Sequence, residues 1–242
     1  MNQCNLFANV NSIETMGLVD GPGIRVVVFL QGCNLRCLYC HNPETWNINH
    51  GKKMSVNEVV EKVARYKNYI SKNGGVTFSG GEPLLQSEFV YECCKRLKEQ
   101  EIHICIDTAG IGDIYDGLID LVDLFIVDVK AVNEEEYKYI TGGDLNRFFE
   151  FIELLERNNK KMWIRQVVVP TVNDDENHVK MLADYIKKLK NVEKVELLPY
   201  HTLGKEKYEK LNIKYRLEGI ENISNTKIEY LRSLLNSYLM QE

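Results

Sequence analysis

Residues 24–46 read IRVVVFLQGCNLRCLYCHNPETW. The first seven of them, IRVVVFL, are dense in β-branched residues, which predicts a strand buried on both faces. Cys33, Cys37 and Cys40 follow directly, with three and then two residues between them. Three thiolates on so short a loop can converge on one centre, and cysteine thiolates, in most cases four, hold iron–sulfur clusters. Three ligands would leave one iron of a [4Fe–4S] cluster open to a small molecule.

Two other interpretations of these cysteines are open. A structural zinc site needs four ligands in a closed tetrahedron, and His41 is the nearest fourth candidate. Because His41 directly follows Cys40, sharing one ion with it would strain the chain. Three unrelated buried cysteines are the other interpretation, which the polar neighbours Asn34 and Arg36 disfavour.

The remaining four cysteines need only structural explanations. Cys93 and Cys94 are neighbours on a predicted helix, so their side chains point about 100° apart and do not easily share a metal. Cys105 lies inside a predicted strand, and Cys4 is close to the N-terminus. No cysteine occurs between Trp46 and Gly74, where a further cluster motif would be inserted. One cluster is therefore predicted.

Strand-like and helix-like segments alternate along the chain. Strands are predicted at residues 24–30, 75–80, 102–108, 123–130, 162–169 and 192–199, and helices after Ser55 and at 87–100, 133–158, 176–190 and 225–239. Such alternation predicts an α/β fold with a parallel sheet and right-handed crossovers, either barrel-like or open and doubly wound. No repeat or linker interrupts it, so we expect one domain over residues 1–242. In both architectures the reactive site lies at the carboxyl ends of the strands.

The composition narrows the class of protein. The chain has 242 residues, of which 44% are hydrophobic and 27% charged, and a net charge of −5. These values exclude disordered, collagen-like and coiled-coil classes, and the negative charge does not favour nucleic acid or anionic lipid as a partner. Because no membrane span or signal peptide is recognisable, we expect a cytosolic protein. We also expect it to be a monomer. In that compartment an odd count of seven cysteines indicates buried or metal-binding thiols, not disulfides.

The motifs together resemble a known family. The C-x3-C-x2-C spacing, with an aromatic residue before the last cysteine, is similar to the signature of the radical S-adenosylmethionine (SAM) superfamily. The wider pattern resembles its glycyl-radical activating enzymes, and most closely the group that acts on pyruvate formate-lyase. This likeness rests on VDGPGIR (19–25), CLYCHNPETW (37–46), SGGEP (79–83), WIRQVVVP (163–170) and LLPYHTLGKEKY (197–208).

The resemblance implies a partial (β/α)6 barrel, one [4Fe–4S] cluster on Cys33, Cys37 and Cys40, and a set of SAM-binding residues. That set is Asn42, Gly80, Gly81, Glu82, Asp107, Thr108, Asp128, Lys130, Arg165 and His201. The same likeness implies that Asp107, Thr108 and Asp128 also hold a monovalent cation, Na⁺ or K⁺, and that Asp20 meets the protein substrate. Each position has a plainer interpretation as well: a turn for the glycines, a structural ion pair for Asp128 with Lys130, an ion pair for Arg165, and a surface residue for His201.

The activity implied by the resemblance is that of an anaerobic oxidoreductase. The cluster would reductively cleave SAM, and the resulting 5′-deoxyadenosyl radical equivalent would abstract hydrogen from a glycine Cα of pyruvate formate-lyase. Flavodoxin or ferredoxin would donate the electron. Three alternatives are kept: activation of another glycyl-radical enzyme, radical chemistry on a small metabolite, and a non-catalytic zinc- or cluster-binding module.

Overall fold

The computed structural model describes residues 6–241, which excludes Cys4. Its strands form one sheet in the order β3-β1-β2-β4-β5-β6-β7-β8. The strands are β1 (Phe7–Gly17), β2 (Arg25–Leu30), β3 (Lys52–Ser55), β4 (Gly75–Gly80), β5 (Ile104–Thr108), β6 (Leu124–Asp128), β7 (Met162–Val168) and β8 (Val192–Pro199). All pairings from β2 to β8 are parallel. The predicted parallel sheet is confirmed, with boundaries that differ by a few residues at most.

Two strands of the sheet were not predicted from the sequence. β1 and β3 add to β2 in antiparallel fashion and extend the sheet at one edge. β1 contains several polar residues and is exposed along much of its length, and β3 has only four residues, KKMS. Neither resembles a strand buried on both faces: β3 is a short strand at the free edge of the sheet, and β1, although paired on both sides, is exposed along much of its length.

The helices are α1 (Val56–Ala64), α2 (Lys67–Ile70), α3 (Ser87–Lys98), α4 (Leu118–Leu121), α5 (Glu134–Thr141), α6 (Leu145–Arg157), α7 (Glu176–Ile186), α8 (Lys205–Lys210) and α9 (Asn225–Leu239). The short helices α2, α4 and α8 were not predicted, and the longer helices follow the prediction with one exception. Short 3-10 turns lie at Pro43–Thr45, Pro83–Gln86 and Thr202–Gly204. The single helix expected at 133–158 is wrong. Gly142 ends α5 in a left-handed conformation, and the Asp144 side chain caps α6, so two helices replace one.

The capping box predicted at the start of α1 is confirmed. The Ser55 hydroxyl accepts a hydrogen bond from the Glu58 amide at 3.2 Å, and the Glu58 carboxylate accepts one from the Ser55 amide at 2.7 Å. Val56, Val59, Val60 and Val63 form the buried face of this helix. The apolar spacing and the cap therefore fix where α1 begins and which face it buries.

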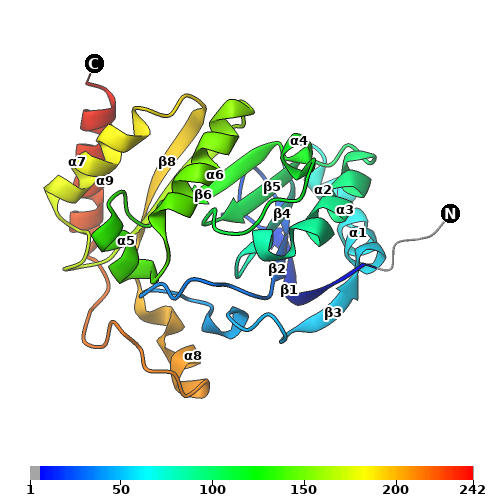
Figure 1. The fold of residues 1–242 in the computed structure, drawn as a ribbon, viewed down its shortest axis with the longest axis horizontal. Coiled ribbons are helices and arrows are strands. Elements are labelled where there is room, and N and C mark those ends of the chain that lie inside the picture. Colours follow the sequence, from blue (N-terminus) through cyan, green and yellow to red (C-terminus); the bar gives the residue numbers. More distant parts are fainter. Residues whose placement is uncertain (1–5, 242) are drawn as a thin grey trace.

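The two faces of the sheet differ in chemistry. One face, with Val28, Phe78 and Ile106, belongs to a continuous apolar core that extends from Ala8 to Leu235. Helices cover it: α1 and α3 pack together at one end of the sheet, and α7 and α9 at the other (Figure 1). The strand register places Asp107 and Arg165 on the opposite, inner face. Because β3 and β8 are its two free edges, the sheet does not close, and its parallel part forms a partial (β/α)6 barrel.

Within the described residues, no helix reaches the combination of length and apolar character that a membrane crossing needs.

Candidate active site

The cysteine loop leaves the carboxyl end of β2 and is held by backbone hydrogen bonds. The Gly32 amide donates to the Thr45 carbonyl at 2.7 Å, and the Cys33 amide donates to the Trp46 carbonyl at 3.2 Å. The Arg36 guanidinium donates to the Cys33 carbonyl at 2.7 Å. The loop is therefore fastened at its start, along its length and at its end, which defines where its thiols lie.

All three thiols line one cavity of about 190 Å³. Burial raises the pKa of Cys33 to about 12, and the nearby Glu82 carboxylate adds to the shift. Burial also raises the pKa of Cys37 to about 11, although Lys130 opposes the shift, and it raises the pKa of Cys40. Thiolates at this position therefore need compensating positive charge, which iron would supply. The residues present fit a cluster with three cysteine ligands.

A zinc ion and an iron–sulfur cluster need different arrangements of their cysteine ligands. Among residues 6–241 there is no group of three His, Cys, Asp or Glu side chains that could hold a metal ion. A tetrahedral zinc site, with Zn–S bonds of about 2.3 Å, brings its sulfur atoms close together. An iron–sulfur cluster takes each cysteine on a different iron and so accepts thiols that lie further apart.

The loop after β4 approaches the cysteine loop very closely at Gly80 and Gly81. A Cβ added to Gly81 would lie 2.2 Å from the Gly32 carbonyl oxygen. Gly80 has a φ of +113°, and a Cβ there would lie 2.4 Å from the backbone of Leu30. Only glycine permits both the approach and the conformation. The two glycines thus bring backbone groups to the wall of the cavity that the thiols share.

Glu82 serves a structural role that the sequence did not indicate. Its side chain is completely buried and accepts hydrogen bonds from the Thr108 hydroxyl at 2.6 Å, the Ala109 amide at 2.9 Å and the Leu84 amide at 3.1 Å. Burial raises its pKa, against the effect of these three donors. Glu82 joins the β4 loop to the end of β5 and is not among the cavity-lining residues.

Charged groups of both signs meet across the cavity from the cysteines. The Lys130 ammonium donates to the Asp128 carboxylate at 2.7 Å and lies 5.5 Å from the centre of the Tyr39 ring. Asp107 accepts a hydrogen bond from the Ser79 hydroxyl at 2.9 Å. Burial raises the pKa of Asp107 to about 7, and repulsion from Asp128 adds to this shift while Arg165 opposes it. Asp107 and Asp128 therefore both need a nearby positive charge in the same part of the cavity.

A second cavity, of about 530 Å³, adjoins the first. Asp20, Arg165 and His201 line it, and two contacts join the cavities: Arg165 pairs with Asp128 in the β6–β7 register, and the His201 ring stacks on His41 at 4.1 Å. Arg165 donates to the Glu196 carboxylate at 3.0 Å. The predicted ion pair of Arg165 is thus confirmed, and the same side chain also borders the cavity.

The segment VDGPG forms one wall of this second cavity and is held at three points. The Arg165 guanidinium donates to the Val19 carbonyl, the Thr77 hydroxyl donates to the Asp20 carbonyl at 2.6 Å, and Arg25 donates to the Pro22 carbonyl at 3.4 Å. The Arg25 side chain is completely buried and also donates to Thr77 at 3.0 Å. Arg25 was visible in the VDGPGIR motif, but no sequence signal indicated its burial.

Asn42 lies outside both cavities. Its side-chain oxygen accepts a hydrogen bond from the Lys207 ammonium at 2.8 Å, and the same ammonium contacts Glu44 at 2.5 Å. Tyr208 donates to the Cys40 carbonyl at 2.9 Å. Helix α8 therefore supports the cysteine loop from its outer side. The motif LLPYHTLGKEKY is the only sequence signal that could have suggested this role.

The structure gathers most of the predicted site residues, as expected, where the parallel strands end. The first cavity is lined by Cys33, Cys37, Cys40, Gly80, Gly81, Asp107, Thr108, Asp128 and Lys130, and the second by Asp20, Arg165 and His201. Asn42 and Glu82 support these walls from behind. Cys93, Cys94 and Cys105 are buried elsewhere, which confirms the structural explanation given to them.

Comparison with known proteins agrees with this arrangement. Residues 27–183 match the model of the radical SAM superfamily. The chain is 50% identical to the pyruvate formate-lyase-activating enzyme of Clostridium pasteurianum, over 97% of this chain and 99% of the relative. It is 40% identical to the pyruvate formate-lyase 1-activating enzyme of Escherichia coli K12, over 97% of both chains.

A solved structure supports the fold independently. Streptococcus suis SuiB bound to its precursor peptide SuiA superposes with a TM-score of 0.67 at 15% identity, over 89% of this chain and 46% of that one. The sequence likeness and the cysteine cavity at the strand ends indicate the same family. The chain belongs to the radical SAM superfamily, in the family of the pyruvate formate-lyase-activating enzymes.

Proposed function

We propose that this chain activates pyruvate formate-lyase by installing a glycyl radical in it under anaerobic conditions. The observation that carries the proposal is the shared cavity of Cys33, Cys37 and Cys40 with the paired glycines and the Asp128–Lys130 ion pair. When bound, the [4Fe–4S] cluster supplies the electron that cleaves SAM to methionine and a 5′-deoxyadenosyl radical equivalent, which takes hydrogen from the glycine Cα.

The chain's own residues bind and orient the substrates. Cys33, Cys37 and Cys40 hold the cluster, and the backbone at Gly80 and Gly81 forms the adjacent wall for the methionyl end of SAM. Lys130, an ammonium fixed by Asp128, is placed for a carboxylate. Arg165 and His201 lie further out, in the cavity where the nucleoside end would extend. Asn42 and Glu82 contribute by positioning the two loops, since their side-chain oxygens are occupied by protein donors.

A monovalent cation would complete the acidic corner of the site. Asp107 and Asp128 repel each other, and a cation between them would relieve the repulsion that raises the pKa of Asp107. Thr108 adds a hydroxyl oxygen at the same strand end. Hard oxygen ligands of this kind suit Na⁺ or K⁺.

The proposal also covers how the partner enzyme is recognised, the state of the chain and its electron donor. Asp20 borders the second cavity, and we assign it to recognition of a loop of the partner enzyme. The chain acts as one domain and as a monomer in the cytosol, with flavodoxin or ferredoxin as its electron donor.

The test is anaerobic. Reconstituted protein, reductant and SAM are mixed with purified pyruvate formate-lyase, and the glycyl radical is sought by EPR. A doublet that requires all components is the expected result. If no radical forms on pyruvate formate-lyase but one forms on another glycyl-radical enzyme, that other enzyme is the substrate of this chain. A colourless, zinc-containing protein that ignores SAM would refute radical chemistry altogether.

A further inference from the structure

The proposed chemistry uses one external electron for each SAM cleaved, and the cysteine loop has an outer side where that electron can arrive. The thiols face the inner cavity, whereas the outer side of the loop borders a separate surface groove of about 580 Å³. Pro43, Trp46, Ile48, Leu211 and Ile213 give this groove, here called the outer groove, an apolar floor. Leu211 is 41% exposed and Ile48 is 39% exposed, so this apolar surface is open to solvent.

Trp46 connects the outer groove with the cluster site. Its indole lines the groove, and its backbone carbonyl accepts a hydrogen bond from the Cys33 amide at 3.2 Å. The ring packs edge-on against Tyr208 at 5.8 Å, and the Arg36 guanidinium lies 4.7 Å from its centre. One aromatic residue therefore lies at the protein surface and directly contacts a cluster ligand.

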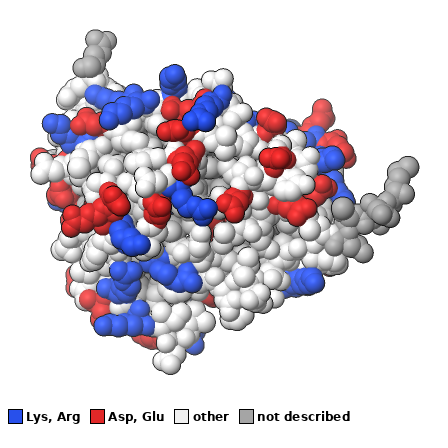
Figure 2. Space-filling view, viewed as in Figure 1, with Lys and Arg blue, Asp and Glu red and all other residues white. Residues whose placement is uncertain are grey.

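The surroundings of the outer groove are basic, although the whole chain carries a net charge of −5. The segment 205–216, KEKYEKLNIKYR, which forms one wall, has five basic and two acidic residues. Lys207 neutralises Glu44 at the groove, and Lys210 and Lys214 are exposed. In the view of Figure 2, Lys and Arg side chains gather on the lower left, over the segment that follows α8 in Figure 1. This local charge favours an acidic partner.

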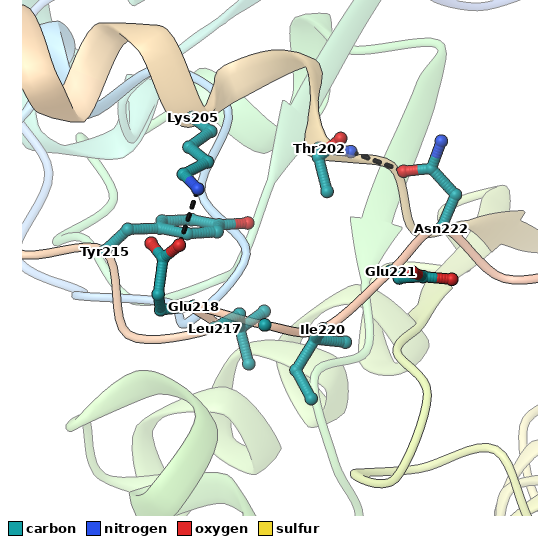
Figure 3. Close-up of a pocket in the computed structure, with 9 residues that line it drawn as sticks. Thr202, Lys205, Tyr215, Leu217, Glu218, Ile220, Glu221 and Asn222 are labelled. Carbon is teal, nitrogen blue, oxygen red and sulfur yellow. Dashed lines mark hydrogen bonds and ion pairs between the residues drawn. The ribbon is translucent and has the colours of Figure 1, made fainter.

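The wall is held in place before any partner arrives. Figure 3 shows the neighbouring pocket, where Lys205 pairs with Glu218 at 2.6 Å and the Thr202 amide donates to the Asn222 side chain at 2.8 Å. Arg216 donates to the Arg36 carbonyl at 3.2 Å and so ties the wall to the cysteine loop. A preformed surface loses little freedom on binding, which suits the small and short-lived interfaces of electron-transfer proteins.

We propose that the outer groove is the docking surface for an acidic one-electron carrier protein, and that Trp46 is the route by which its electron reaches the cluster. The inference rests on the proposed function, because it needs the cluster that the three cysteines would hold. One electron leaves the reduced flavin or iron–sulfur centre of the carrier, which is oxidised by one unit, and the cluster is reduced by one. No bond is made or broken, and no proton is transferred.

The test compares three cluster-loaded proteins: the wild type, a Lys210→Glu/Lys214→Glu variant, and a Lys180→Glu/Lys188→Glu control with the same change in net charge. Lys180 lies on α7 and Lys188 follows it, and both are exposed; α7 lies at the upper left of Figure 1, whereas α8 lies at the bottom. Reduced flavodoxin is the probe. Bleaching of the cluster is followed by stopped flow, the Kd for oxidised flavodoxin is measured at low and high salt, and dithionite serves as a reductant that needs no docking.

We expect Lys210→Glu/Lys214→Glu to weaken flavodoxin binding by about tenfold at low salt and to flatten its salt dependence, since charges at the rim of an interface mainly steer association. Reduction by dithionite and the subsequent SAM cleavage should match the wild type, and the control should behave as the wild type throughout. Trp46→Leu should slow cluster bleaching even at saturating flavodoxin, where a change in Kd no longer limits the rate, provided that its cluster absorbance is intact.

Equal flavodoxin affinity and equal bleaching rates in the wild type and Lys210→Glu/Lys214→Glu would overturn the docking surface. Normal bleaching in Trp46→Leu would overturn the route. In both cases the dithionite reaction would still support the proposed function. A wild-type protein that cleaves no SAM even with dithionite would instead remove the proposed function, and this inference with it.

Discussion

Asp107→Asn tests whether burying the Asp107 carboxylate beside Asp128 costs stability at the active site. Burial and Asp128 raise the pKa of Asp107 from 3.8 to about 7, so the folded protein binds a proton there more tightly than the unfolded chain does. Folded-state stability is therefore lost as pH rises from about 4 to about 7, and the loss is complete above pH 7. A shift of about three units corresponds to about 4 kcal/mol at most. Because the side chain is partly exposed, we expect about 2–4 kcal/mol after screening.

Asparagine has the same shape and no charge, so Asp107→Asn should be more stable than the wild type at pH 8 and equal to it near pH 4. For a chain of this size the gain corresponds to a rise in Tm of roughly 4–16 °C. Thermal unfolding of the cluster-free proteins, followed by circular dichroism in choline chloride buffers, measures it. Adding KCl at constant ionic strength should stabilise the wild type more than the variant. A Tm difference that is absent at pH 8, or that does not change with pH, would refute the reasoning.

Three further changes test other parts of the site. Cys37→Ala should abolish cluster absorbance and reduce SAM cleavage to background while circular dichroism shows an intact fold; retained cleavage would contradict its assignment as a ligand. Asp20→Ala should preserve unproductive SAM cleavage but lower the glycyl radical yield measured by EPR, whereas Glu14→Ala, at an exposed position on β1, should leave the yield unchanged. Gly81→Ala should destabilise the fold by roughly 1–3 kcal/mol in urea unfolding, because its Cβ would lie 2.2 Å from the Gly32 carbonyl oxygen; an unchanged midpoint would show that the two loops can separate freely.

The parallel part of the fold was predictable because its signal is local. Six apolar, β-branched runs marked the strands, and the valines after Ser55 marked α1 with its cap. β1 and β3 could not be found in this way, because β3 is a short edge strand and β1 is exposed along much of its length, so neither needs a continuous apolar run. The division of residues 133–158 into two helices depended on Gly142 and Asp144, whose effects on chain direction were hidden within an otherwise helical pattern.

The site was predictable to the extent that its residues stand next to strand ends. Cysteines, glycines and acidic residues that follow different parallel strands meet at one edge of the sheet whatever the details of packing. The direction in which each side chain points could not be predicted in this way. Glu82 and Asn42 occupy motif positions but turn toward Thr108 and Lys207, and their partners come from other parts of the chain.

The sequence by itself determined the chemistry of this protein: three cysteines with a spacing that suits one cluster, and a set of motifs that could be placed on strand ends. Local spacing and residue type carry that information. Only the tertiary structure decided that Arg25 is a buried anchor of the VDGPG segment, that Glu82 bonds to Thr108 and Ala109 outside the cavity wall, and that Trp46 joins a cluster ligand to the surface. These relations join residues far apart in the chain, and burial and charge act through space.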